Sequence, residues 1–206
     1  LKTSISLRRN RIVGGGHGGV HMCEWARGFL KQNQLAEDSG PALVVATGAD
    51  PAVDENTISE CASFGVHVLA GGRGRYANNK SSMNGAAGLC VEADASSDVR
   101  ANEICENDEA GVRVRAAANA RIYGNTMHGN GGAGIEVEGE GTTQLRDNEV
   151  HSNKGLGGLI VRAATEVVVS DNNVHGNDAV GVLLLEGANP LLAKNRVVEN
   201  GAEGVR

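Results

Sequence analysis

Residues 111–137 have the sequence GVRVRAAANARIYGNTMHGNGGAGIEV, and the pattern that opens this stretch returns at its end. Gly-Val-Arg-Val at 111–114 is followed 23 residues later by Gly-Ile-Glu-Val at 134–137. Aliphatic residues that alternate with polar ones are typical of a short strand with one buried face. This stretch therefore predicts two equivalent strands separated by one repeat.

The 23-residue period extends over the chain. With Gly19 taken as repeat position 1, steps of 23 reach Gly134, and after one inserted residue the series resumes at Gly158. Repeat positions 2, 4, 12 and 17 are mostly aliphatic. Each repeat therefore holds three short strands and has no room for a helix between them.

Three strands per 23 residues predict one turn, or rung, of a parallel β-helix whose rungs stack about 4.8 Å apart. The predicted fold is all-β, a right-handed parallel β-helix of eight to nine rungs forming one domain over residues 1–206. The slip in register predicts a one-residue bulge near residues 154–157. Because the chain starts and stops within a repeat, we expect a fragment of a longer protein with open strand edges.

Asparagine at repeat position 15 marks an inward corner column. It is present in every repeat, at Asn10, Asn33, Asn56, Asn79, Asn102, Asn125, Asn148, Asn172 and Asn195. A second column follows at position 20, at Asn84, Asn107, Asn130, Asn153, Asn177 and Asn200. Stacked amides can hydrogen-bond along the rod and satisfy the backbone at the corners, so both columns are predicted to be structural.

The composition excludes several classes of function. The chain has 206 residues, a net charge of -6 and 2% aromatic residues, which does not fit the basic, aromatic surface of a nucleic-acid-binding protein. No apolar run approaches the length of a membrane span. The four cysteines fall at different repeat positions, so we expect free thiols, a reducing compartment and a cytoplasmic or nuclear location.

The stretch GGGHGG at 14–19 is predicted to be a corner. It lies in register with GNGGAG at 129–134. A phosphate-binding loop would need a Lys-Ser/Thr pair after the glycines and a helix that starts there. The sequence has no such pair after Gly19 and no helix is expected there, so this interpretation is rejected.

A functional site on this fold gathers outward-facing residues from adjacent rungs. Position 18 places Cys105, His128, His151 and His175 on four successive rungs. Three parallel histidines do not surround an ion tetrahedrally, and an exposed stack is the alternative. We therefore expect no metal and no cofactor, with the three histidines as the candidates should a metal bind.

Position 14 carries the best candidates for catalysis. Asp147 and Asp171 lie on adjacent rungs and Lys194 follows on the next. Paired carboxylates beside a base suit polysaccharide chemistry, whereas aspartate just before a corner asparagine also caps a turn. The turn is the favoured interpretation, and we assign no catalytic residue.

Positions 3 and 5 become aliphatic near both ends of the rod, and this predicts an exposed apolar surface for a protein partner. Its residues are Val44, Leu69, Ile160, Leu183 and Leu185. A neighbouring loop or tail of the full protein that covers the surface is the alternative.

The segments between strands resemble a known family. GADPAVDENTI at 48–58 and GANPLLAKNRV at 187–197 share a Gly-x-Asx-Pro turn, while ARGFLKQNQL at 26–35 and GGRGRYANNK at 71–80 share an Arg-Gly variant of it. With RRNRIVGGGHGGVHM at 8–22, they resemble the β-helix of F-box-only ubiquitin-ligase subunits, and more broadly the carbohydrate-binding and sugar-hydrolase repeats. In the ligase family, this resemblance implies a β-helix that recognises substrates.

A comparison with pectin-hydrolysing enzymes is less favourable. Of the motifs known in those enzymes, only Gly-His-Gly at 16–18 is present, and the chain contains no Asp-Asp pair. The expected function is therefore a non-catalytic scaffold for protein recognition of the F-box type. The alternative is a β-helix that binds or cleaves a polysaccharide.

Overall fold

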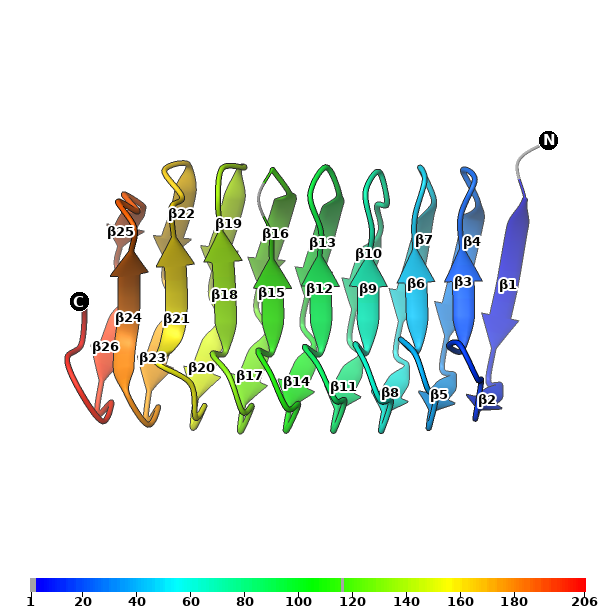
Figure 1. Ribbon diagram of the computed structural model, residues 1–206, viewed down its shortest axis with the longest axis horizontal. Helices are drawn as coiled ribbons and strands as arrows, with labels where there is room; N and C mark the ends of the chain where they lie inside the picture. The colour runs from blue at the N-terminus through cyan, green and yellow to red at the C-terminus, as the bar shows by residue number, and fades with distance from the viewer. Residues whose placement is uncertain (1–2, 116) are drawn as a thin grey trace.

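The computed structural model describes residues 3–115 and 117–206 and shows a right-handed parallel β-helix. The rungs lie side by side along a rod, with the two ends of the chain at opposite ends (Figure 1). None of the described residues is helical, and all strand pairs are parallel. The predicted fold class is therefore confirmed.

The strands form three sheets that run the length of the rod. Sheet A contains β1 (Ser4–Arg8), β4 (Arg27–Lys31), β7 (Asp50–Asp54), β10 (Arg75–Ala77), β13 (Ser96–Arg100), β16 (Asn119–Tyr123), β19 (Thr143–Arg146), β22 (Val167–Ser170) and β25 (Leu191–Ala193). Sheet B contains β2 (Arg11–Val13), β5 (Gln34–Ala36), β8 (Thr57–Ser59), β11 (Lys80–Ser82), β14 (Glu103–Cys105), β17 (Thr126–His128), β20 (Glu149–His151), β23 (Asn173–His175) and β26 (Arg196–Val198). Sheet C contains β3 (Val20–Met22), β6 (Leu43–Val45), β9 (Val66–Val68), β12 (Leu89–Val91), β15 (Val112–Val114), β18 (Ile135–Glu138), β21 (Gly157–Arg162) and β24 (Val180–Leu185).

The register between rungs follows the sequence period. Residues 23 apart pair from the first rung onward, as in Val112 beside Ile135. The spacing becomes 24 in the corner before β21, because the Gly155 amide still bonds the Gly132 carbonyl whereas Leu159 pairs with Ile135. The extra residue therefore lies next to the exposed Leu156, and the predicted bulge at 154–157 is confirmed.

The core is a column of aliphatic side chains that fills the rod. Positions 2, 4, 12 and 17 supply it, and Leu43, Val45, Val53 and Ile58 of one rung are almost completely buried. Each strand has three to six residues, so a rung encloses only a few such side chains. Burial of this repeated stripe is the dominant favourable contribution to folding.

Both asparagine columns are ladders of hydrogen bonds inside the corners. In the position-15 ladder, Asn102 donates both its backbone N–H and its side-chain amide to Oδ1 of Asn125, at 2.9 Å each. Asn125 donates in turn to Oδ1 of Asn148 at 3.1 Å and to the Val99 carbonyl at 2.9 Å. The predicted inward, structural role of this column is confirmed.

The residue before each ladder asparagine has a left-handed backbone. At position 14, φ is 54° at Arg9, 55° at Glu55 and 53° at Asp147, so the conformation does not depend on the side chain. Such φ values cost energy for residues other than glycine. We attribute their persistence to the asparagine that follows, whose backbone and side chain are both fixed by hydrogen bonds to the next rung.

Candidate functional site

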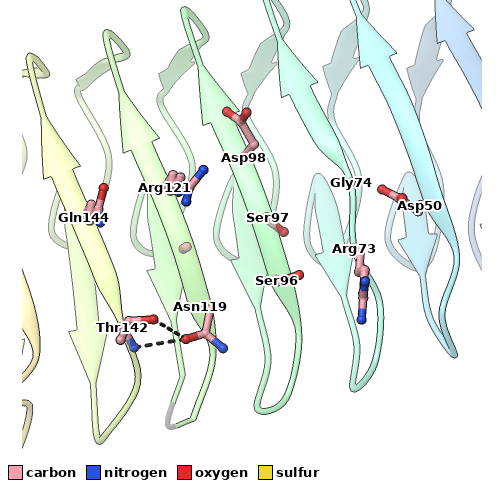
Figure 2. A pocket seen from close by; sticks show the side chains of 11 residues that line it. Asp50, Arg73, Gly74, Ser96, Ser97, Asp98, Asn119, Arg121, Thr142 and Gln144 are labelled. Atoms are coloured by element: carbon pink, nitrogen blue, oxygen red, sulfur yellow. Dashed lines mark hydrogen bonds between the residues drawn. The ribbon is translucent and has the colours of Figure 1, made fainter.

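A polar hollow lies on the outer face of sheet A. It has a volume of about 390 Å³ and is lined by residues of β7, β13, β16 and β19 and of the segment just before β10. Its lining is polar, with Asp98, Arg121 and Gln144 contributed by successive strands (Figure 2). These three side chains are outward neighbours in the register, so the hollow follows the axis of the rod.

A second hollow of about 360 Å³ continues along the same face. Asp98, Arg121 and Gln144 line it as well, together with Tyr123, Arg146 and Asp147. The two hollows therefore form one groove, called here the sheet A groove. A groove that presents polar side chains on successive rungs, about 4.8 Å apart, suits a linear ligand lying along the rod.

Asp98 is one of two residues of the groove, with Ser97, that have a buried polar atom without a hydrogen-bond partner in the described chain. Its Oδ1 is buried, and no hydrogen-bond partner is found for it among the described residues. It lies between Arg75 and Arg121 in the register, yet no ion pair joins it to either of them within residues 3–115 and 117–206. A buried carboxylate oxygen without a donor is costly and is a recognised feature of binding sites.

The remaining charged groups of the groove are partly paired. Arg100 donates from Nη1 to the Tyr123 hydroxyl at 3.1 Å. Arg146 Nε lies 3.0 Å from Asp147 Oδ2 and 3.8 Å from Asp171 Oδ2. The groove thus offers both hydrogen-bond donors and acceptors to a ligand, and Tyr123 adds a planar ring.

The catalytic candidates at position 14 lie at a corner beside the groove. Asp147 and Asp171 are brought together by Arg146, and only Asp147 lines a hollow. Lys194 is on the next rung, and no salt bridge connects it to them in the described part of the chain. All three residues have a positive φ, at 53°, 57° and 55°, which supports the turn interpretation.

The position-18 column is a stack of imidazoles on sheet B. The rings of His128 and His151 are parallel, with centroids 5.1 Å apart, and His151 and His175 repeat the arrangement at 5.2 Å. Burial, followed by the charges of His128 and His175, lowers the pKa of His151. At one end of the stack, His175 contacts Glu149 through Nε2 at 2.5 Å.

All four cysteines are free, as expected from their spacing. Burial raises the pKa of the Cys90 thiol to about 12 and that of Cys105 to about 11. Each lies beside a histidine and a glutamate, in the clusters His67, Cys90, Glu92 and Glu103, Cys105, His128. The reducing compartment, cytoplasmic or nuclear, stays a prediction.

The predicted apolar surface is only partly exposed. Ile160 and Leu183 are 6% and 2% exposed, because they form a cluster with Ala133, from the corner before β18, and with Val180, at the start of β24. Exposure was therefore predicted wrongly for these two residues. Val44, Leu69 and Leu185 are half-buried, and a binding role for the five residues stays a prediction.

Sequence reasoning missed the sheet A groove. Its outward residues fall at repeat positions 11 and 13, which carry Asp98, Arg121 and Gln144, and Tyr123 and Arg146. These columns change identity from rung to rung and show no repeated chemistry. A comparison of positions 11 and 13 from rung to rung places these side chains together.

The sequence profile of the family described as "Right handed beta helix region" matches residues 2–118 and 87–206. The chain belongs to this family. No curated protein matches it in sequence. A helix able to cross a lipid bilayer is absent from residues 3–115 and 117–206.

Several solved structures share the fold. The A-module of the Azotobacter vinelandii mannuronan C-5 epimerase AlgE4 is 15% identical with a TM-score of 0.66, over 92% of this chain and 61% of that one. The periplasmic alginate epimerase AlgG is 14% identical with a TM-score of 0.69, over 100% and 58%. Tailspike protein 2 of an Escherichia coli O157:H7 bacteriophage is 9% identical with a TM-score of 0.59, over 94% and 34%. The chain thus spans less than two thirds of these proteins.

These similarities correct the expected function. The F-box-type scaffold for protein recognition is wrong as the main interpretation, because the structures that resemble this chain include alginate epimerases that act on a polysaccharide. The broader resemblance, to right-handed β-helix repeats, is confirmed by the family match. The short turns that suggested the ligase family belong to the corners of the solenoid. They indicate the fold and do not indicate what the outer faces bind.

Proposed function

We propose that the protein binds a polysaccharide along the sheet A groove. The observation that carries the proposal is the buried, unpartnered Oδ1 of Asp98 at the centre of a polar groove that runs over several rungs. Sugar hydroxyls supply the donors that this oxygen lacks. The alginate epimerases of the same fold add support by analogy.

The groove favours an acidic polysaccharide over a neutral one. Arg121 is exposed on the groove and forms no salt bridge with any described residue, so its guanidinium is free to contact a carboxylate. Arginine binds carboxylates in a bidentate manner. Gln144, on the next strand, can hydrogen-bond the neighbouring sugar unit.

The test is a binding titration of the whole chain with mannuronan, polygalacturonate and the neutral polymer dextran. Asp98→Ala is the test variant, and alanine suits the strand because Ala52 occupies the same column on β7. Asp178→Ala, which removes an exposed carboxylate at a corner, is the matched control. We expect binding of an acidic polymer that Asp98→Ala weakens at least about tenfold and the control leaves unchanged. Equal binding by the two variants would overturn the site.

A second candidate is chemical action on the bound polysaccharide. It is favoured by Asp98 and Tyr123, which lie on adjacent strands and line the same hollow. A carboxylate and a phenol can act as proton acceptor and donor, and the Arg100 guanidinium would stabilise the phenolate of Tyr123. NMR of the polymer after incubation tests for altered or cleaved units. Turnover lost in Tyr123→Phe with binding retained would support it, and an unaltered polymer would exclude it.

A further inference from the structure

A cluster of three different metal-ligating side chains lies on the outer face of sheet B, away from the sheet A groove. Glu103 and Cys105 lie two residues apart on β14, so both belong to the same side of that strand. His128 on β17 is the register partner of Cys105. The ligand atoms of the three residues all lie within 4.8 Å of one another.

The distances within this cluster suit a tetrahedral ion. Oε1 of Glu103 lies 3.5 Å from Nε2 of His128 and 3.7 Å from Sγ of Cys105. Zinc bonds of about 2.0 Å to nitrogen and oxygen and about 2.3 Å to sulfur give tetrahedral edges of about 3.3–3.7 Å. The three side chains therefore stand near the spacing of one face of a zinc tetrahedron, whereas good hydrogen bonds would be shorter.

The geometry points to a zinc-binding site formed by Glu103, Cys105 and His128. Imidazole, thiolate and carboxylate together suit zinc, while a sulfur ligand disfavours calcium and magnesium. The His151 ring is stacked parallel to His128 at 5.1 Å, and its nitrogens do not belong to the cluster of ligand atoms. The fourth position is thus left to water. On binding, the Cys105 thiol proton leaves to solvent and the sulfur bonds the metal.

The same carboxylate oxygen already attracts a cation. Lys80 Nζ lies 2.8 Å from Glu103 Oε1, the oxygen that also faces Cys105 and His128. The ammonium therefore competes with zinc for this oxygen. Glu106 adds a second negative charge near the Cys105 thiol. Zinc must displace the Lys80 ammonium from this oxygen. Removal of Lys80 should therefore tighten zinc binding.

A second cluster provides an internal comparison. His67, Cys90 and Glu92 on sheet C have the same three side-chain types. Cys90 is completely buried, and Arg113 is its register partner. The charges of Arg113 and Arg115 both act on the Cys90 sulfur and would repel a cation. The sheet B cluster is therefore the better site.

The experiment is a cobalt(II) titration of the whole chain, with zinc added afterwards as competitor. Cobalt serves as a probe because thiolate ligation gives a charge-transfer band. The variants are Cys105→Ser, His128→Gln and Lys80→Gln, with Cys90→Ser as the matched control. Serine is compatible with position 105, since Ser59 and Ser82 precede it in the same column and are buried there. Far-UV circular dichroism checks that each variant folds.

We expect one equivalent of cobalt to give the thiolate band and zinc to displace it. Cys105→Ser should abolish the band, and His128→Gln should weaken binding at least about tenfold. Lys80→Gln should tighten binding about threefold, the size of one exposed ion pair. Cys90→Ser should bind like the parent. Absence of a band in the parent, a band that survives Cys105→Ser, or a band lost in Cys90→Ser would each overturn the assignment.

Discussion

The asparagine ladder inside the rod and the groove outside sheet A both stack polar side chains on successive rungs, but their surroundings differ. Asn125 lies between two identical residues, and each amide donates to the next carbonyl oxygen. Asp98 lies between two arginines that form no ion pair with it in the described chain, and its Oδ1 has no partner. Polar groups satisfied by the same residue one rung away hold the fold together. Polar groups that the neighbouring rungs leave unsatisfied are available to a ligand.

The largest effect is expected from breaking the ladder in the middle of the rod. Asn125→Leu removes the bonds to Asn148 and to the Val99 carbonyl, and leaves the amide of Asn102 without its acceptor. We expect the free energy of unfolding to fall by about 1–3 kcal/mol, as for a buried polar network left unsatisfied. Chemical denaturation measures the change.

Asn10→Leu is the matched control for that variant. Asn10 is exposed at the first rung of the ladder, where it donates to Asn33. Its replacement should cost clearly less than that of Asn125. Equal losses at the two positions would show that the ladder does not act as a continuous network.

The groove should respond in the opposite manner, with an effect on binding and none on folding. Arg121→Gln removes a guanidinium that no described carboxylate pairs with, so the unfolding midpoint should stay unchanged. Binding of an acidic polysaccharide should weaken about tenfold, the value of a charge-assisted hydrogen bond. Affinity for a neutral polysaccharide should not change. Calorimetric titration with both polymers distinguishes lost charge recognition from general damage.

One rung of the second asparagine ladder has a cysteine in place of asparagine, and a substitution can restore the missing amide. Position 20 is occupied by Cys61 in one rung, and its backbone N–H donates to Asn84 Oδ1 at 3.2 Å without the side-chain bond found further along. Cys61→Asn would supply that amide. We expect the free energy of unfolding to rise by about 1 kcal/mol, the net value of one buried hydrogen bond. A lower thermal midpoint would show that the thiol, which lies 3.4 Å from the Ser59 carbonyl, fits this site better.

The interior of the protein was predictable from the sequence because every rung repeats the same physical requirement. A side chain at position 12 or 15 must match the one above and below it, so Leu30 and Val53, or Asn33 and Asn56, recur at a fixed spacing. The left-handed backbone at residues such as Glu55 was not predicted, because glutamate gives no sequence signal for a positive φ.

The outer faces were harder to predict, because nothing obliges them to repeat. Arg121 and Gln144 share a column but not a charge, and the groove exists only through their combination with Asp98. Ile160 and Leu183 were placed correctly on the outer side of sheet C, yet Ala133 and Val180 cover them. Local packing of this kind does not repeat from rung to rung, so the burial of these side chains cannot be predicted from the repeat pattern.

The smallest effect is expected at an ion pair between successive rungs of sheet C, formed by Arg115 and Glu138. Arg115 Nη1 lies 3.4 Å from Glu138 Oε2, and both side chains are 41% exposed. Like the asparagine bonds, this contact joins two successive rungs, but both of its partners are open to water. A double-mutant cycle with Arg115→Gln and Glu138→Gln should therefore give a coupling free energy of a few tenths of a kcal/mol, which decreases further in high salt. A coupling above about 1 kcal/mol would mean that repetition along the rod stabilises surface charges as strongly as it stabilises the buried amides.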